Sequence, residues 1–167
     1  MTNGNPCGMK YDLLANSLRY PAGDVEMEEL YTRTFDVQAI AYLDVGYVLF
    51  GEDYKRGHFL VKMQALQREY DNDCGTELPD HLPNILTLLP KMADQQEVEE
   101  LVGKLVLPAI DKMTQGFKES ENPYLEALRT VAEVLKEDYP RARILHEAST
   151  KTLDLPALQN YSNLEDA

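Results

Sequence analysis

Apolar residues recur every three to four positions along most of the chain, which is the spacing of one face of an α-helix. The spacing predicts helices over about 9–18, 24–31, 36–50, 54–70, 80–89, 94–117, 123–135 and 140–153. No segment alternates apolar and polar residues as a half-buried strand does, and no repeat of fixed period occurs. The pattern therefore predicts an all-α fold, a single-domain helical bundle of about seven or eight helices.

Capping residues and prolines place the ends of several of these helices. Asp36 is expected to cap the third helix and Gly51 to stop it, and Asp80 is expected to cap the fifth. Pro108 should kink the sixth helix, because its ring removes a backbone donor. The dipeptide Asn122-Pro123 is typical of a helix start and opens the seventh.

The third predicted helix, over 36–50, is apolar almost all round and is therefore expected at the centre of the bundle. Gly46 would cost this helix about 1 kcal/mol relative to alanine, so close packing is its expected compensation. Asp44 lies in the same stretch, where an unpaired carboxylate would be costly to bury. It is expected either to face a gap at the bundle surface or to pair with a cation such as Arg56 or Arg33, and pairing is favoured over a role as a ligand.

The length of 167 residues fits one domain with a single core. Residues 1–8 are interpreted as a polar N-terminal tail, 9–153 as the helical domain and 154–167 as a flexible C-terminal tail. The polar stretch after the fourth helix places a hinge between two helical halves at 71–80.

The formal charge of -13 and a pI near 4.6 bear on what the bundle contacts. Such an acidic surface repels phosphates, which argues against nucleic acid and anionic membranes as partners. A basic polypeptide segment is a better candidate, and solubility alone is the other interpretation of the charge. The longest apolar run, over 39–50, is too short to span a bilayer, and the N-terminus lacks a signal-peptide pattern. We therefore expect a cytoplasmic protein that does not insert into a membrane.

Catalytic and metal-binding chemistry has little support in the sequence. It contains no P-loop, no GxGxxG turn after a strand, no GxSxG motif and no HExxH motif, and Cys7 and Cys74 form no CxxC pair. His58 and His146 are each expected to be exposed rather than to bind a ligand. We therefore expect a protein that is not an enzyme and that holds no cofactor and no metal.

The segment 77–83, Glu-Leu-Pro-Asp-His-Leu-Pro, allows three interpretations. In the first it is helix punctuation, because Pro79 bars helix before it and Asp80 caps the helix that follows. In the second, Glu77, Asp80 and His81 belong to a metal site, although no further ligand stands at an identifiable spacing. In the third it is a rigid hinge whose polar groups help to present a groove to a bound peptide. Composition does not choose between the first and the third.

The stretch 41–57 ends in Gly-Glu-Asp-Tyr-Lys-Arg-Gly, whose tyrosine, mixed charges and two glycines suit either a plain connection or peptide recognition. Together with the segment 77–83 and the helix start at 122–124, it resembles the nitrate reductase delta subunit (NarJ) branch of the NarJ/TorD/DmsD redox-enzyme maturation chaperones. The resemblance covers roughly 31–135, and the paired order of the two motifs is its specific feature.

This resemblance implies an all-helical, TorD/NarJ-like chaperone without a cofactor, either a monomer or a dimer. Its partner would be the catalytic molybdopterin subunit of a molybdenum-containing iron–sulfur oxidoreductase, nitrate reductase or a relative, bound commonly through its N-terminal segment. The chaperone would hold that subunit competent for molybdenum-cofactor insertion and delay its membrane docking or export. The alternatives are a stable accessory subunit of the mature oxidoreductase and, less favoured, a small metal-dependent enzyme.

The candidate peptide-binding or hinge residues are those that match the family's two motifs, with Asp44 and Tyr54 beside them. The hinge motif of the family is matched by Glu77, Pro79, Asp80 and His81. Its other recurrent stretch contains Tyr42, Tyr47, Glu52, Arg56 and Gly57. No catalytic and no metal-ligating residue is expected.

Overall fold

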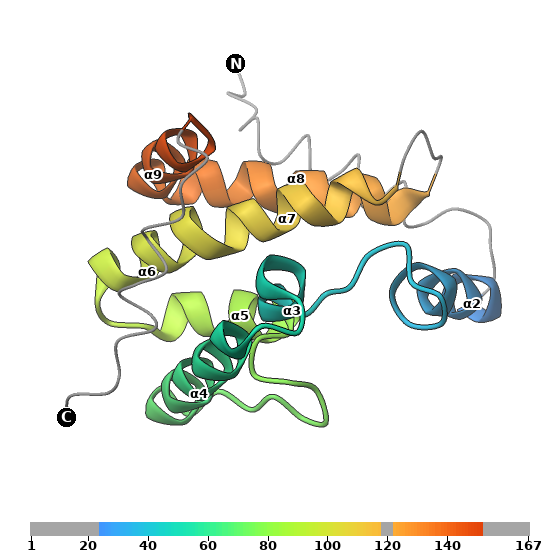
Figure 1. Ribbon diagram of the computed structural model, residues 1–167, viewed down its shortest axis with the longest axis horizontal. Helices are drawn as coiled ribbons and strands as arrows, with labels where there is room; N and C mark the ends of the chain where they lie inside the picture. The colour runs from blue at the N-terminus through green and yellow to red at the C-terminus, as the bar shows by residue number, and fades with distance from the viewer. Residues whose placement is uncertain (1–23, 118–121, 152–167) are drawn as a thin grey trace, which may run out of the picture.

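Helices make up most of the described part of the computed structural model, which comprises residues 24–117 and 122–151 (Figure 1). Within these ranges no β-strand is present, and the predicted all-α class is confirmed. The predicted helix over 9–18 and both predicted tails, 1–8 and 154–167, lie outside the described residues. None of the described helices combines the length and the apolarity needed to cross a bilayer.

The elements follow one another along the chain as a series of helices joined by loops. They are α2 (Asp24–Phe35), α3 (Val45–Phe50), α4 (Tyr54–Glu69), α5 (Leu82–Leu88), a 3-10 turn η1 (Leu89–Lys91), α6 (Gln95–Leu101), a π-helical segment η2 (Val102–Val106), α7 (Leu107–Gln115), α8 (Pro123–Asp138) and α9 (Pro140–Lys151). Because α6, η2 and α7 form one uninterrupted helix, seven helices occupy the described residues.

The long helix made of α6, η2 and α7 runs through the core of the bundle. Leu101, Val102, Leu105 and Leu107, in and beside η2, have no solvent-exposed surface. The predicted disturbance by Pro108 takes the form of the π-helical segment just before it, where the Leu107 N–H donates to the Val102 carbonyl five residues back. A wider turn of this kind accommodates a proline inside a helix that continues on both sides.

Helix α9 crosses the π-helical segment at very short range, and Gly103 makes that crossing possible. A Cβ atom at position 103 would lie 2.5 Å from the Ala142 carbonyl oxygen and 2.9 Å from the Ala142 Cα. The same helix carries His146, whose predicted exposure is wrong: it is 7% exposed, and its Nε2 lies 2.7 Å from Asp111 Oδ2 on α7. Burial between two helices explains the difference, because an imidazole can be buried when a carboxylate is its partner.

The predicted helix over 36–50 is wrong in its first two thirds. Helix α2 continues one turn past its predicted end, and the chain then crosses to the core through a connector, 36–44, before α3 begins at Val45. The connector is anchored by backbone hydrogen bonds that do not follow a helical pattern, since the Ile40 and Ala41 N–H groups both donate to the Thr34 carbonyl. Gln38 adopts a positive φ of 53° within it. Asp36 therefore does not cap a helix.

An aromatic cluster joins α2 to the rest of the bundle. The Phe35 ring lies 5.1 Å from the Tyr124 ring and 6.4 Å from the Phe117 ring, and the Tyr31 ring lies 5.8 Å from that of Tyr124. The Asn122 side chain caps α8, as predicted, by accepting from the Tyr124 N–H, and its amide donates to Thr34 on α2. Figure 1 shows α2 at the side of the bundle, reached through the long connector.

We expect Gly103→Ala to lower the free energy of unfolding by about 1–3 kcal/mol, because the added methyl would clash with the backbone of α9 rather than with a movable side chain. Urea denaturation measures the change. Gly57→Ala is the matched control: position 57 lies in α4 with nothing within 4 Å of its Cβ, so the same substitution should stabilise by up to about 1 kcal/mol. Equal effects of the two substitutions would contradict the close crossing.

Candidate functional site

Two segments that are far apart in the sequence meet as a single antiparallel β-bridge between Asp44 and His81. The Val45 N–H donates to the Asp80 carbonyl at 3.0 Å, and the Leu82 N–H donates to the Leu43 carbonyl at 2.9 Å. The bridge therefore joins the residues just before α3 to those just before α5. It brings together the two stretches that the sequence singled out, 41–57 and 77–83.

Asp80 is fully buried beneath the first turn of α3. Its Oδ2 accepts a hydrogen bond of 2.8 Å from the Gly46 N–H, while its Oδ1 has no hydrogen-bond partner among the described residues. Burial raises the pKa of the Asp80 carboxyl, the Gly46 N–H opposes that rise, and the charge of Asp44 adds to it. The predicted role of Asp80 as the cap of α5 is wrong. His81 occupies the cap position of α5, and the Asp80 carboxylate instead accepts a hydrogen bond from the Gly46 N–H in α3.

The close packing predicted for Gly46 is present, and the Asp80 carboxylate is its cause. A Cβ atom on Gly46 would lie 2.7 Å from Asp80 Oδ2 and 2.9 Å from Phe59 Cδ1. A side chain at position 46 would therefore displace either the buried carboxylate or the aromatic ring below it. Glycine is needed here for space, since its φ is not in the left-handed region.

Asp44 pairs with the side chains of His81 and Arg56 at the edge of this bridge. Its Oδ1 lies 3.1 Å from His81 Nδ1, and its Oδ2 lies 4.0 Å from Arg56 Nη2. The predicted pairing with Arg56 is present, whereas Arg33 pairs with Glu29 on α2. The hydrogen bond to Asp44 raises the pKa of His81, burial opposes that rise, and the nearby negative charges of Asp44, Glu77 and Asp80 add to it.

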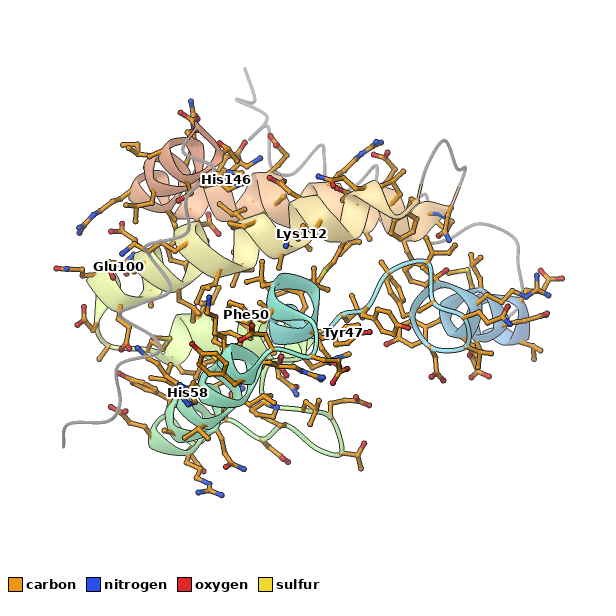
Figure 2. All side chains as sticks on the ribbon, viewed as in Figure 1. Tyr47, Phe50, His58, Glu100, Lys112 and His146 are labelled. Atoms are coloured by element: carbon orange, nitrogen blue, oxygen red, sulfur yellow. The ribbon has the colours of Figure 1, made fainter. Side chains whose placement is uncertain are left out.

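Two tyrosines pack together beside Arg56, the residue that pairs with Asp44. The Tyr42 and Tyr47 rings meet edge to face with centroids 4.7 Å apart, and the Arg56 guanidinium carbon lies 5.0 Å from the centre of the Tyr47 ring. Tyr42 is 43% exposed, so this face reaches solvent. Figure 2 places Tyr47 on the side of α3 that faces the connector from α2. We call the six side chains around the β-bridge, namely Tyr42, Asp44, Tyr47, Arg56, Asp80 and His81, the bridge cluster.

The remaining candidate residues lie around the bridge cluster or apart from it. Glu52, Tyr54 and Gly57 are exposed at the start of α4, where the Tyr54 ring contacts His58 instead of the cluster. Glu77 is exposed, and only its charge acts on His81. The Pro79 carbonyl accepts a hydrogen bond of 2.8 Å from the side chain of Gln67.

Gln67 belongs to a buried amide network that the sequence analysis missed. Gln67 and Asn72 are 3% and 8% exposed, and the Asn72 amide donates to Gln67 Oε1 at 2.6 Å and to the Asn84 carbonyl at 3.1 Å. The network braces the loop between α4 and α5 from the inside. One signal was available: Gln67 is an amide on the otherwise apolar face of α4 that contains Phe59 and Met63.

The bridge cluster combines charged groups, hydrogen bonds and aromatic faces. Among the described side chains, no group of three or more His, Cys, Asp or Glu residues is placed to hold a metal ion. The His81 imidazole pairs with the Asp44 carboxylate, and the Asp80 carboxylate accepts a hydrogen bond from the α3 backbone through its Oδ2. A comparison with protein-family models, with curated proteins and with solved structures finds no match for this chain.

The raised pKa of His81 predicts how stability depends on pH. Its ordinary value is near 6.5, and a higher folded-state value means that the folded protein binds the proton more tightly than the unfolded chain. This stabilisation is complete below pH 6.5 and is lost as the pH rises through the folded pKa. Asp80 contributes with the same sign in a window that begins lower, near pH 3.8.

We therefore expect the free energy of unfolding to fall as the pH rises from 6.5 through the folded pKa of His81, and expect Asp44→Asn to flatten that fall. NMR titration of the His81 ring measures its pKa in both proteins, and the value should drop in the variant because the hydrogen bond to a carboxylate is gone. Global stability at several pH values comes from urea denaturation. An unchanged His81 pKa would contradict the pairing with Asp44.

Proposed function

We propose that the protein is a molecular chaperone for the catalytic subunit of a molybdenum-containing iron–sulfur oxidoreductase, nitrate reductase or a relative. In this proposal it binds the N-terminal segment of that subunit through the bridge cluster before the cofactor is inserted. One observation supports it above the others: the two stretches that carry the family resemblance meet in one place, through Asp44 with His81 and Gly46 with Asp80. Asp44 and His81, 37 positions apart in the chain, pair at its partly exposed edge.

The surroundings of the bridge cluster suit an amphipathic peptide with basic residues. Ile40 and Tyr42 on the connector and Leu78 on the α4–α5 loop each expose at least 40% of their surface, so apolar side chains are available on both segments that form the bridge. An amphipathic helix binds by placing one apolar face against such side chains. The net charge of -13 attracts the basic residues of the same peptide, which speeds association and adds specificity.

We expect Tyr42→Ala to weaken binding of a peptide with the N-terminal sequence of the molybdoenzyme's catalytic subunit by roughly tenfold, because exposed tyrosines at the centre of an interface contribute strongly to affinity. Calorimetric titration measures the dissociation constant. Tyr54→Ala is the matched control, since Tyr54 is 69% exposed and lies outside the bridge cluster. Variants of Asp80 are unsuitable for this test because its carboxylate is buried in the fold.

Equal losses in the two tyrosine variants, or no binding by the parent protein, would contradict the proposal. A second measurement separates a chaperone from an accessory subunit. The tagged protein should co-purify with the catalytic subunit from cells that cannot make the molybdenum cofactor, and should be missing from the mature enzyme. Recovery in the mature enzyme at a one-to-one ratio would favour the accessory subunit.

A further inference from the structure

Three buried side-chain polar atoms lack hydrogen-bond partners among the described residues, and besides His58 Nδ1 they are two atoms of opposite character that belong to residues packed around Gly46. One is the donor Nε of Arg56, and the other is the acceptor Oδ1 of Asp80. Arg56 Cγ lies 3.5 Å, and Asp80 Oδ2 2.7 Å, from the point at which a Cβ of Gly46 would stand. The guanidinium group is therefore within reach of the Asp80 carboxylate, because three further bonds separate it from Cγ.

In the structure the Arg56 guanidinium points elsewhere, and it is held loosely. It stacks on Tyr47 at 5.0 Å, and its Nη2 lies 4.0 Å from Asp44 Oδ2. A hydrogen-bonded guanidinium–carboxylate pair has N–O distances of about 2.7–2.9 Å, so this contact is an ion pair without a hydrogen bond. The Asp44 side chain is also 27% exposed, so it remains open to solvent on its outer side.

We propose that the guanidinium of Arg56 is a resident cation. In the unbound protein it occupies the place between Tyr47 and Asp44, and on binding an arginine or lysine side chain of the partner takes that place. When the partner's side chain enters, Arg56 turns inward to Asp80 and pairs with its Oδ1. The inference rests on the proposed function only for the identity of the partner. In it, the bridge cluster recognises an arginine or lysine of the partner, and Arg56 regulates access to the place that this side chain takes.

The exchange keeps one positive charge beside Asp44. It also gives a hydrogen-bond partner to buried polar atoms that have none in the unbound protein. A partner cation replaces the Arg56 cation beside Asp44, so Asp44 and His81 keep their environment. Arg56 in turn brings a positive charge to a carboxylate whose burial raises its pKa, which favours the ionised form of Asp80. A neutral partner side chain lacks the charge needed to replace Arg56. The resident cation therefore competes with basic side chains for the place beside Asp44, and it has little effect on a ligand whose side chain is neutral and does not enter that place.

The test uses two synthetic peptides and one substitution. The first peptide is a short acetylated and amidated amphipathic helix with leucines on one face and a single arginine, and the second has citrulline, a neutral isostere, in place of that arginine. Arg56→Gln removes the resident cation, so the arginine peptide should bind about 3- to 30-fold more tightly to the variant than to the parent. The citrulline peptide should gain less than twofold. Arg129→Gln on α8, where Arg129 pairs with Glu126 on the helix surface, is the control and should change neither.

Asp80→Asn tests the inward position of Arg56. This substitution should weaken binding of the arginine peptide when Arg56 is present and should have no effect in the Arg56→Gln protein, because no guanidinium then needs a place. Thermal unfolding establishes that each variant is folded. Should Asp80→Asn fail to fold, the 15N-labelled Arg56 Nε–H resonance of the parent protein still reports the move, since it should shift downfield on saturation with the arginine peptide.

Tighter binding of the arginine peptide alone, together with a moved Arg56 resonance, supports the proposal. Weaker binding of that peptide to the Arg56→Gln protein would overturn it, since Arg56 would then be a contact for the ligand rather than its competitor. Equal changes for the two peptides, or no binding by either, would overturn it as well. Neither peptide contains molybdoenzyme sequence. Failure of the natural segment alone therefore rejects the partner assignment, and failure of the synthetic pair alone rejects the exchange.

Discussion

The burial of the Asp80 carboxylate beneath α3 is the constraint on which the organisation of this end of the molecule depends. A carboxylate is costly to bury without a hydrogen-bond donor, and the Gly46 N–H supplies one. That contact needs a glycine at position 46, and it needs α3 to begin where the chain is paired with the start of α5. The same pairing places His81 beside Asp44. A single buried charge thus determines the approach of two helices and the composition of the surface above them.

The rest of the bundle supplies a rigid support for this surface. The long helix formed by α6, η2 and α7 passes through the core, and its π-helical turn and Gly103 allow α9 to pack directly on it. Helix α2 is attached separately, through aromatic rings and through hydrogen bonds from α8, such as that from Asn122 to Thr34. The connector from α2 reaches the core at the β-bridge.

The bridge cluster combines buried side chains with side chains that face solvent. Asp80 serves the fold, Tyr42 faces solvent, and Asp44, His81 and Arg56 lie between these extremes with partial exposure. Arg56 has two carboxylates within reach and is well bonded to neither, which distinguishes it from the helix-surface ion pairs such as Arg129 with Glu126. A residue with two available partners is suited to change partners on binding, and this is the physical basis of the proposed exchange.

The sequence by itself determined the helical class, most helix boundaries, the disturbance at Pro108 and the need for close packing at Gly46. These follow from the apolar spacing, from caps and from proline, which act over one or two turns of chain. Only the tertiary structure decided the fate of 36–44, the burial of Asp80 and the burial of His146. For the two buried side chains, a partner distant in the sequence outweighs the local pattern. Asp80 is hydrogen-bonded to Gly46 across 34 positions, and His146 to Asp111 across 35. Local spacing carries no information about such partners, because a hydrogen bond between them forms only after the helices have packed.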